Sequence, residues 1–285
     1  MAIGAAILAV SLLSGFADGP PGTKRSTVQS TATLDARTPT PTISTTTIAG
    51  ASLETGDYLV NRSRKPDPRP SNEGAVPAAN SLPDLKSFRV GLQAGHWKSE
   101  EFPDELSGVK GLLGASGEGW NEVDVNLELA RGVADLLASE GIRVDVLPAV
   151  IPPHYTADAF VALHVDYAPG SPLTGFKLAR SIWSVIPEKD EALLNELRDQ
   201  YEAGTGLPEN VGTISDNMTE YYTFNNRKHD HAVDPSTPAT VLEMGFLSNP
   251  KDRELLLHRQ EVIARSIAEG ILRFLRNDLR GRPGS

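Results

Sequence analysis

Cysteine is absent from the 285 residues of the chain. This absence excludes disulfides, thiolate metal ligands, a cysteine nucleophile and a lipid-modified N-terminal cysteine. Positive charge is also scarce, because 27 Lys and Arg stand against 37 Asp and Glu and leave a net charge of −10. No basic run or basic–aromatic patch stands out, so we expect no nucleic-acid partner.

One long apolar run is present, at residues 1–17 (MAIGAAILAVSLLSGFA). It has the length of a signal peptide and is short for a membrane span. Gly15, Phe16 and Ala17 supply small residues where a cleavage site needs them, but no Lys or Arg precedes the run. We interpret the run as a signal peptide or a membrane anchor, and we expect the protein to be exported or tethered.

The next segment, residues 18–85, is rich in Ser, Thr and Pro. Such a segment buries too little apolar surface to offset the entropy lost on ordering, so we predict a disordered linker. A globular pattern begins at residue 86 and continues to about residue 280. We expect one folded domain there, in a protein that is a monomer.

Strands and helices alternate in the globular region. We expect strands at 87–96, 142–148, 158–168, 176–186 and 237–248, and helices at 120–141, 187–204 and 249–279, the last with a possible break near His258. This alternation predicts an α/β fold with a mostly parallel twisted sheet flanked by helices. In such folds the functional site lies at the carboxyl ends of the strands.

Chemically active side chains occur at the ends of these expected strands. His96 ends the first strand, His164 ends the third, and Glu243 interrupts the apolar run of the last. A carboxylate inside an apolar run needs a partner or a task. His96, His164 and Glu122, at the start of the first long helix, are the ligand types of a catalytic zinc site. Ordinary strand-end histidines and a helix-dipole acid are the alternative interpretation of the same residues.

Four segments resemble, in order, those of zinc-dependent N-acetylmuramoyl-L-alanine amidases of the Amidase_3 type. They are AGHWKSE (94–100), GWNEVDVNLELARGVADLLASEGIRVDVL (119–147), ADAFVALHVDYA (157–168) and TPATVLEMGFLSNPKDRELL (237–256). The resemblance extends over residues 88–278. It implies that residues 86–280 form a zinc amidase catalytic domain.

By the same resemblance, His96, Glu122 and His164 bind one Zn²⁺ and Glu243 is the catalytic acid–base residue. The implied reaction is hydrolysis of the amide bond between N-acetylmuramic acid and L-alanine of the stem peptide in peptidoglycan, by zinc-activated water. The implied location is extracytoplasmic, either secreted, in the cell wall or tethered to the membrane.

The sequence departs from the family pattern beside two of the ligands. Gln93 and Ala94 stand where the family has Asp-Pro, and Val165 and Asp166 stand where it has Ala-Asn. Two alternatives therefore stay open. One is a catalytically inactive amidase-like protein that binds the cell wall, and the other is a zinc peptidase that cuts within the stem peptide.

The long segment 213–236 precedes the last expected strand and concentrates three aromatic residues. We interpret it as lining a substrate groove, with Tyr222 and Asn225 as substrate-binding candidates beside Asp166. The alternative is a helix that packs its aromatic side against the sheet.

Overall fold

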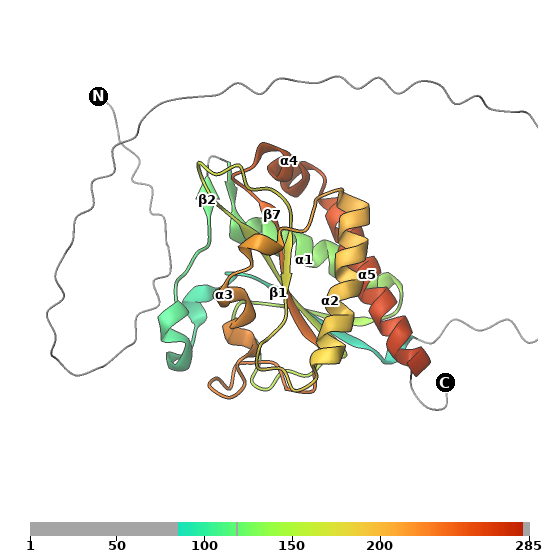
Figure 1. Ribbon diagram of the computed structural model, residues 1–285. Helices are drawn as coiled ribbons and strands as arrows, with labels where there is room; N and C mark the ends of the chain where they lie inside the picture. The colour runs from blue at the N-terminus through green and yellow to red at the C-terminus, as the bar shows by residue number, and fades with distance from the viewer. Residues whose placement is uncertain (1–84, 118, 282–285) are drawn as a thin grey trace, which may run out of the picture. The chain divides into compact units, whose positions relative to one another are not determined.

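A computed structural model of the protein describes residues 85–117 and 119–281 (Figure 1). The expected signal peptide or anchor, and the expected linker up to residue 84, lie outside these residues. Within the described part of the chain, no helix combines the length and the apolar character needed to cross a membrane.

A five-stranded sheet forms the centre of the described region, with strand order β4-β1-β5-β7-β6. The strands are β1 Arg89–Ala94, β4 Arg143–Leu147, β5 Ala159–Asp166, β6 Lys177–Ala179 and β7 Ala239–Phe246. Strands β4, β1, β5 and β7 are parallel, and β6 lies antiparallel to β7. A separate small hairpin joins β2 Ser116–Gly117 and β3 Trp120–Asn121. The predicted α/β fold with a mostly parallel sheet is confirmed.

The strand expected at 176–186 is much shorter in the structure. Only Lys177–Ala179 pairs with β7. The chain then turns, because the hydroxyl of Ser181 accepts from the backbone N–H of Trp183 and that of Ser184 accepts from the N–H of Ile186. Serine side chains commonly compete with ladder hydrogen bonds in this way, so the apolar residues of this segment do not continue the strand.

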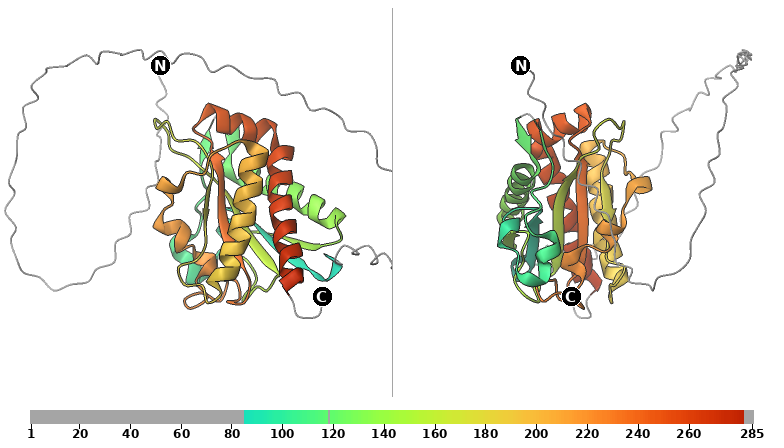
Figure 2. Two further views of the ribbon diagram at one scale, coloured as in Figure 1. Left: turned by 45° about the vertical axis from the view of Figure 1, so that its right-hand side comes forward. Right: turned by 90° about the vertical axis from the view of Figure 1, so that its left-hand side faces the viewer.

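The long helices cover one face of the sheet. The helices are α1 Glu122–Ser139, α2 Pro187–Thr205, α3 Asp216–Thr219, α4 Pro250–His258 and α5 Gln260–Gly281, with short 3₁₀ turns η1 Leu85–Ser87, η2 Ser99–Glu101, η3 Asp104–Val109, η4 Val211–Thr213 and η5 Tyr222–Phe224. Helices α2 and α5 lie side by side (Figure 2), and α1 packs against both α5 and the sheet. The break near His258 separates α4 from α5, as expected.

The opposite face of the sheet is covered by loops and short helices. Phe160 and Ala162 of β5 face this side, where they pack with residues such as Phe224 of η5. Val161 and Leu163 alternate with them and face the long helices. Both faces of β5 are therefore buried, which explains its continuous apolar sequence.

Helix α1 begins and ends close to where the sequence predicts. The side chain of Asn121 caps its start by accepting from the backbone N–H of Asp124 at 2.8 Å. Gly141, with φ of 87°, follows the last turn. Leu129 and Val133 are fully buried on its inner face, and such side chains each contribute about 1.5–3 kcal/mol on burial. This packing fixes the start of α1, where Glu122 lies.

Candidate metal centre

His96 follows β1 in an unusual backbone conformation. Its φ of 63° lies in the left-handed region, which is sparsely populated by non-glycine residues and is over-represented at functional sites. Its Nδ1 lies 2.7 Å from the carbonyl oxygen of Leu112. A carbonyl can only accept, so Nδ1 carries a hydrogen and Nε2 is the nitrogen left to bind a cation. Burial opposes protonation of His96, but the hydrogen bond and charge of Glu122 outweigh it and raise the pKa of the imidazole.

Glu122 is the first residue of α1 and is only 4% exposed. Its Oε2 accepts from the backbone N–H of Ala115 at 2.9 Å, and its Oε1 accepts from Asn126 Nδ2 at 3.3 Å. Oε1 also lies 3.3 Å from His96 Nε2 and 3.2 Å from His164 Nδ1. Burial alone would raise the pKa of this carboxyl group, but the two histidines hold it well below its usual range. Glu122 is therefore ionised at neutral pH.

His164 lies near the end of β5 and is 7% exposed. Its ring rests on Gly95, where an added Cβ would lie 2.3 Å from the ring Cε1. The rings of His96 and His164 are nearly perpendicular, with centroids 4.9 Å apart. Burial, as the largest cause, lowers the pKa of His164, so its imidazole is neutral at neutral pH.

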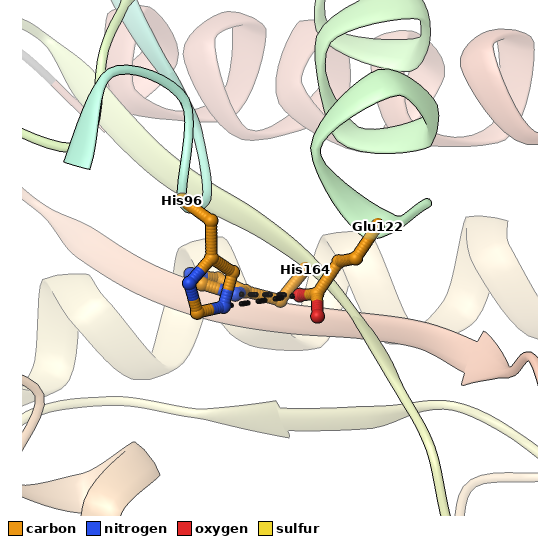
Figure 3. Close-up of side chains that lie close together, drawn as sticks. All are labelled: His96, Glu122 and His164. Atoms are coloured by element: carbon orange, nitrogen blue, oxygen red, sulfur yellow. Dashed lines mark hydrogen bonds and ion pairs between the residues drawn. The ribbon is translucent and has the colours of Figure 1, made fainter. Parts of the chain in front are cut away.

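These three side chains form one cluster. One ligand atom from each of His96, Glu122 and His164 lies within 4.8 Å of the other two (Figure 3). An ionised carboxylate between two imidazoles suits a divalent cation, and two histidines with one acid are a common catalytic zinc set. The cluster predicted from the sequence is therefore brought together in space, and its donor atoms could hold a metal ion.

Glu243 lies on β7 directly opposite His164 of β5. Its Oε2 is enclosed and has no hydrogen-bond partner among the described residues. Burial raises the pKa of Glu243 to about 8, and the charges of Asp166 and Glu122 add to this effect, while Lys177 acts against it. The sheet therefore places a second carboxylate, with a pKa near neutrality, beside the metal-ligand cluster.

Asp166 extends beyond His164 at the end of β5. Its Oδ2 forms an ion pair with Lys177 Nζ, and its Oδ1 accepts from the backbone N–H of Tyr167 at 2.8 Å. Lys177 itself is 5% exposed and lies opposite Glu243 in the β6–β7 ladder. The sequence reasoning missed Lys177, although a lysine inside the apolar run FKLA is a detectable signal of a buried charge.

The other two substrate-binding candidates lie in or next to η5. Tyr222 donates its hydroxyl hydrogen to the carbonyl oxygen of Ala149 at 2.7 Å, and its ring packs edge-on against Phe102. This hydroxyl is engaged inside the protein, and a substrate contact of the partly exposed Tyr222 stays a prediction. Asn225 is partly exposed and its backbone carbonyl accepts from the N–H of Lys228 and of His229.

Residues 151–273 match the family model of N-acetylmuramoyl-L-alanine amidases. The resemblance of this part of the sequence to these amidases is therefore confirmed. The match contains His164 and Glu243, and the fold brings His96 and Glu122 from the preceding part of the chain to the same place.

Two curated relatives are named "Probable cell wall amidase LytH" and come from two strains of Staphylococcus epidermidis. Each is 26% identical over 212 residues, which cover 70% of this chain and 63% of the relative. The chain thus spans less than two thirds of the length of these amidase relatives.

Solved structures of amidases also align with this chain. Ami1 from Mycobacterium abscessus is 18% identical and has a TM-score of 0.49, over 67% of this chain and all of the other. CwlD from Clostridioides difficile, solved in complex with the GerS lipoprotein, is 19% identical and has a TM-score of 0.46. The alignment covers 67% of this chain and 100% of the CwlD chain.

Proposed function

We propose that this protein is a peptidoglycan hydrolase that cleaves the amide bond between N-acetylmuramic acid and L-alanine of the stem peptide. The observation that carries the proposal is the convergence of four side chains from distant parts of the sequence. His96, Glu122 and His164 form the ligand cluster, and Glu243 stands opposite His164 on the next strand. The family match over 151–273 supports the same reaction.

We propose that the cluster holds one Zn²⁺. His96 would bind through Nε2, Glu122 through Oε1 and His164 through Nδ1, since these are the atoms that face one another. Two neutral imidazoles and one carboxylate leave the bound dication with a net positive charge. When bound in such a set, zinc lowers the pKa of water and polarises a carbonyl group.

The two carboxylates of the site have different tasks in this proposal. Glu122 accepts several hydrogen bonds and its pKa is held well below the usual range, so it does not exchange protons near pH 7. Glu243 has an enclosed oxygen with no hydrogen-bond partner within residues 85–117 and 119–281, and its pKa is about 8. A general base works best when its pKa lies near the operating pH, and a neighbouring cation would lower this pKa further toward neutrality.

Glu243 therefore takes a proton from the attacking water at its carboxylate and passes it to the nitrogen of the leaving amine. The C–N bond of the amide breaks. The water oxygen becomes part of the carboxylate formed on the lactyl group of muramic acid, and L-alanine of the stem peptide is released with a free amine. Among the remaining candidates, Asp166, Tyr222 and Asn225 are proposed to contact the substrate.

A protein that cleaves peptidoglycan has to act outside the cytoplasm. We propose that residues 1–17 export the chain or tether it to the membrane, and that residues 18–85 link this segment to a catalytic domain at 86–280. The name of the staphylococcal relatives, a cell wall amidase, supports this location.

The test uses the purified full chain, loaded with zinc and incubated with peptidoglycan with and without a chelator. A parallel sample carries Glu243→Gln, which keeps the side-chain shape but cannot take up a proton. We expect free stem peptides with an L-alanine amine end in mass spectra of the active sample alone. New ends within the stem peptide would instead indicate a peptidase. Intact peptidoglycan, sedimenting with zinc-loaded protein, would indicate a binding protein and refute hydrolysis.

A further inference from the structure

His164 has a hydrogen-bonding neighbour at each ring nitrogen. Nδ1 lies 3.2 Å from Glu122 Oε1, and Nε2 lies 2.9 Å from the hydroxyl oxygen of Tyr221. A neutral imidazole carries a hydrogen on one nitrogen only. If Nδ1 is to offer its lone pair to a cation beside Glu122, the hydrogen has to be on Nε2. Tyr221 must then accept this hydrogen bond.

Tyr221 can accept from His164 only if its own hydrogen points elsewhere. The structure provides this acceptor, since the Tyr221 hydroxyl donates to Gln93 Oε1 at 3.0 Å. The hydroxyl of Tyr222 is the other neighbour, at 3.5 Å, which is long for an O–H···O bond. The hydroxyl of Tyr221 is therefore oriented by Gln93.

Gln93 in turn has only one workable orientation. Its Nε2 lies 2.8 Å from the carbonyl oxygen of Ala149. Since a backbone carbonyl can only accept, the amide nitrogen has to face Ala149, and Oε1 has to face Tyr221. Gln93 is fully buried, so water cannot replace either partner. The carbonyl of Ala149 therefore fixes the orientation of the Gln93 amide, and the amide in turn fixes the direction in which the Tyr221 hydroxyl donates.

We propose that Gln93 and Tyr221 are positioning residues that hold His164 in the tautomer with its hydrogen on Nε2. This leaves the lone pair of Nδ1 to a cation bound beside Glu122, whose Oε1 otherwise accepts from Nδ1 at 3.2 Å. The inference rests on the proposed metal site but goes beyond it, because it assigns a task to the residue that departs from the family's Asp-Pro pattern. His96 has the opposite arrangement, with its hydrogen on Nδ1 facing Leu112. The two histidines of one site therefore carry opposite tautomers.

The tautomers can be measured directly in the full chain. Two-bond ¹H–¹⁵N correlation spectra of ¹⁵N-histidine protein distinguish Nδ1–H from Nε2–H, and the chain has only 6 histidines. We expect one metal-bound histidine of each kind in the zinc-loaded wild type. If both ligand histidines carry their hydrogen on Nδ1, the inference is wrong. This readout needs no variant, so it decides the question even if a substitution prevents folding.

Tyr221→Phe removes the hydroxyl and keeps the ring, which packs against His164 with centroids 5.5 Å apart. We expect zinc affinity, measured by competition with a chromogenic chelator, to fall about 10- to 100-fold, as is usual when a ligand's outer partner is lost. Tyr155→Phe is the matched control. It removes a hydroxyl on the same face of the sheet, but that hydroxyl donates to Asp145. Equal affinities for Tyr221→Phe and the wild type would overturn the inference.

Gln93→Leu tests whether Gln93 sets the direction in which the Tyr221 hydroxyl donates. Without Gln93 Oε1, the nearest remaining acceptor for the Tyr221 hydroxyl is Nε2 of His164 itself. We expect zinc affinity to fall, because the Tyr221 hydroxyl would then donate to Nε2 and disfavour the tautomer that binds the cation through Nδ1. An unchanged zinc affinity would contradict the proposed role of Gln93. A wild-type chain that binds no zinc would overturn the proposed metal site as well, whereas zinc binding with the wrong tautomer would overturn only this inference.

Discussion

Replacing Glu243 by glutamine should stabilise the metal-free protein at alkaline pH while abolishing hydrolysis. The enclosed carboxyl group has a pKa of about 8 in the folded protein, compared with about 4.3 for an unperturbed glutamate. Between these two values the folded state holds a proton that the unfolded state has released. The free energy of unfolding therefore falls as the pH rises through this window, and it levels off above the folded-state pKa.

The size of the effect follows from the shift in pKa. A difference of about 3.7 pKa units corresponds to about 5 kcal/mol at 1.36 kcal/mol per unit. This is an upper limit, because Glu243 as a whole is partly exposed although its Oε2 is enclosed. Glutamine is neutral at every pH, so the free energy of unfolding of the variant does not contain this pH-dependent contribution. Subtracting the two unfolding curves cancels the other titrating groups that both proteins share.

The assay is urea unfolding of the full chain and of Glu243→Gln in excess chelator, from about pH 4 to pH 9. We expect similar stabilities near pH 4 and a growing advantage of the glutamine variant above it, which levels off above about pH 8. With saturating zinc the pH dependence should move to lower pH, since a nearby cation lowers the pKa of a carboxyl group. A stability difference that does not change with pH would refute the reasoning about Glu243.

Three further predictions concern the ligand cluster. Gly95→Ala should lower zinc affinity about 10- to 100-fold, because the added Cβ would displace the His164 ring. Gly108→Ala is the control and should leave the affinity unchanged, since no atom of the described residues lies within 4 Å of its added Cβ. Competition titration measures both affinities. Asn126→Ala should cost about 1–3 kcal/mol in urea unfolding, since it removes the buried donor to Gly95 O and Glu122 Oε1. Zinc at about 100 times its dissociation constant should raise the free energy of unfolding by about 2.7 kcal/mol. His96→Ala should not show this gain, and an equal gain in that variant would place the bound zinc elsewhere.

Each residue of the cluster stands at a boundary that is visible in the sequence, but only the family resemblance singled the three out as a ligand set. His96 and His164 end apolar runs that form β1 and β5, and Glu122 follows the cap residue Asn121. Local hydrogen bonding is harder to foresee. The strand expected at 176–186 ends at Ala179 because serine hydroxyls turn the backbone, and an apolar pattern carries no sign of this.

The support of His164 could not be predicted from local patterns at all. Gln93 and Tyr221 are 128 residues apart, and only the packing of η5 and the loop before it against the sheet brings them together. In the sequence, Gln93 was visible only as a departure from the family pattern and Tyr221 only as one of several aromatics. The role of residues 1–84 stays a prediction.

The environments of the two carboxylates also bear on the choice between an enzyme and a wall-binding protein. A protein that only holds a cation needs Glu122, whose oxygens are satisfied by Ala115, Asn126 and the histidines. It has no use for Glu243, whose Oε2 lacks a hydrogen-bond partner in the part of the chain that the structure describes and whose ionisation weakens the fold. Groups that lower stability are typically found where function requires them. The proposed role of Glu243 in proton transfer accounts for its burial beside the cluster, whereas metal binding alone does not, and this favours the proposed hydrolase.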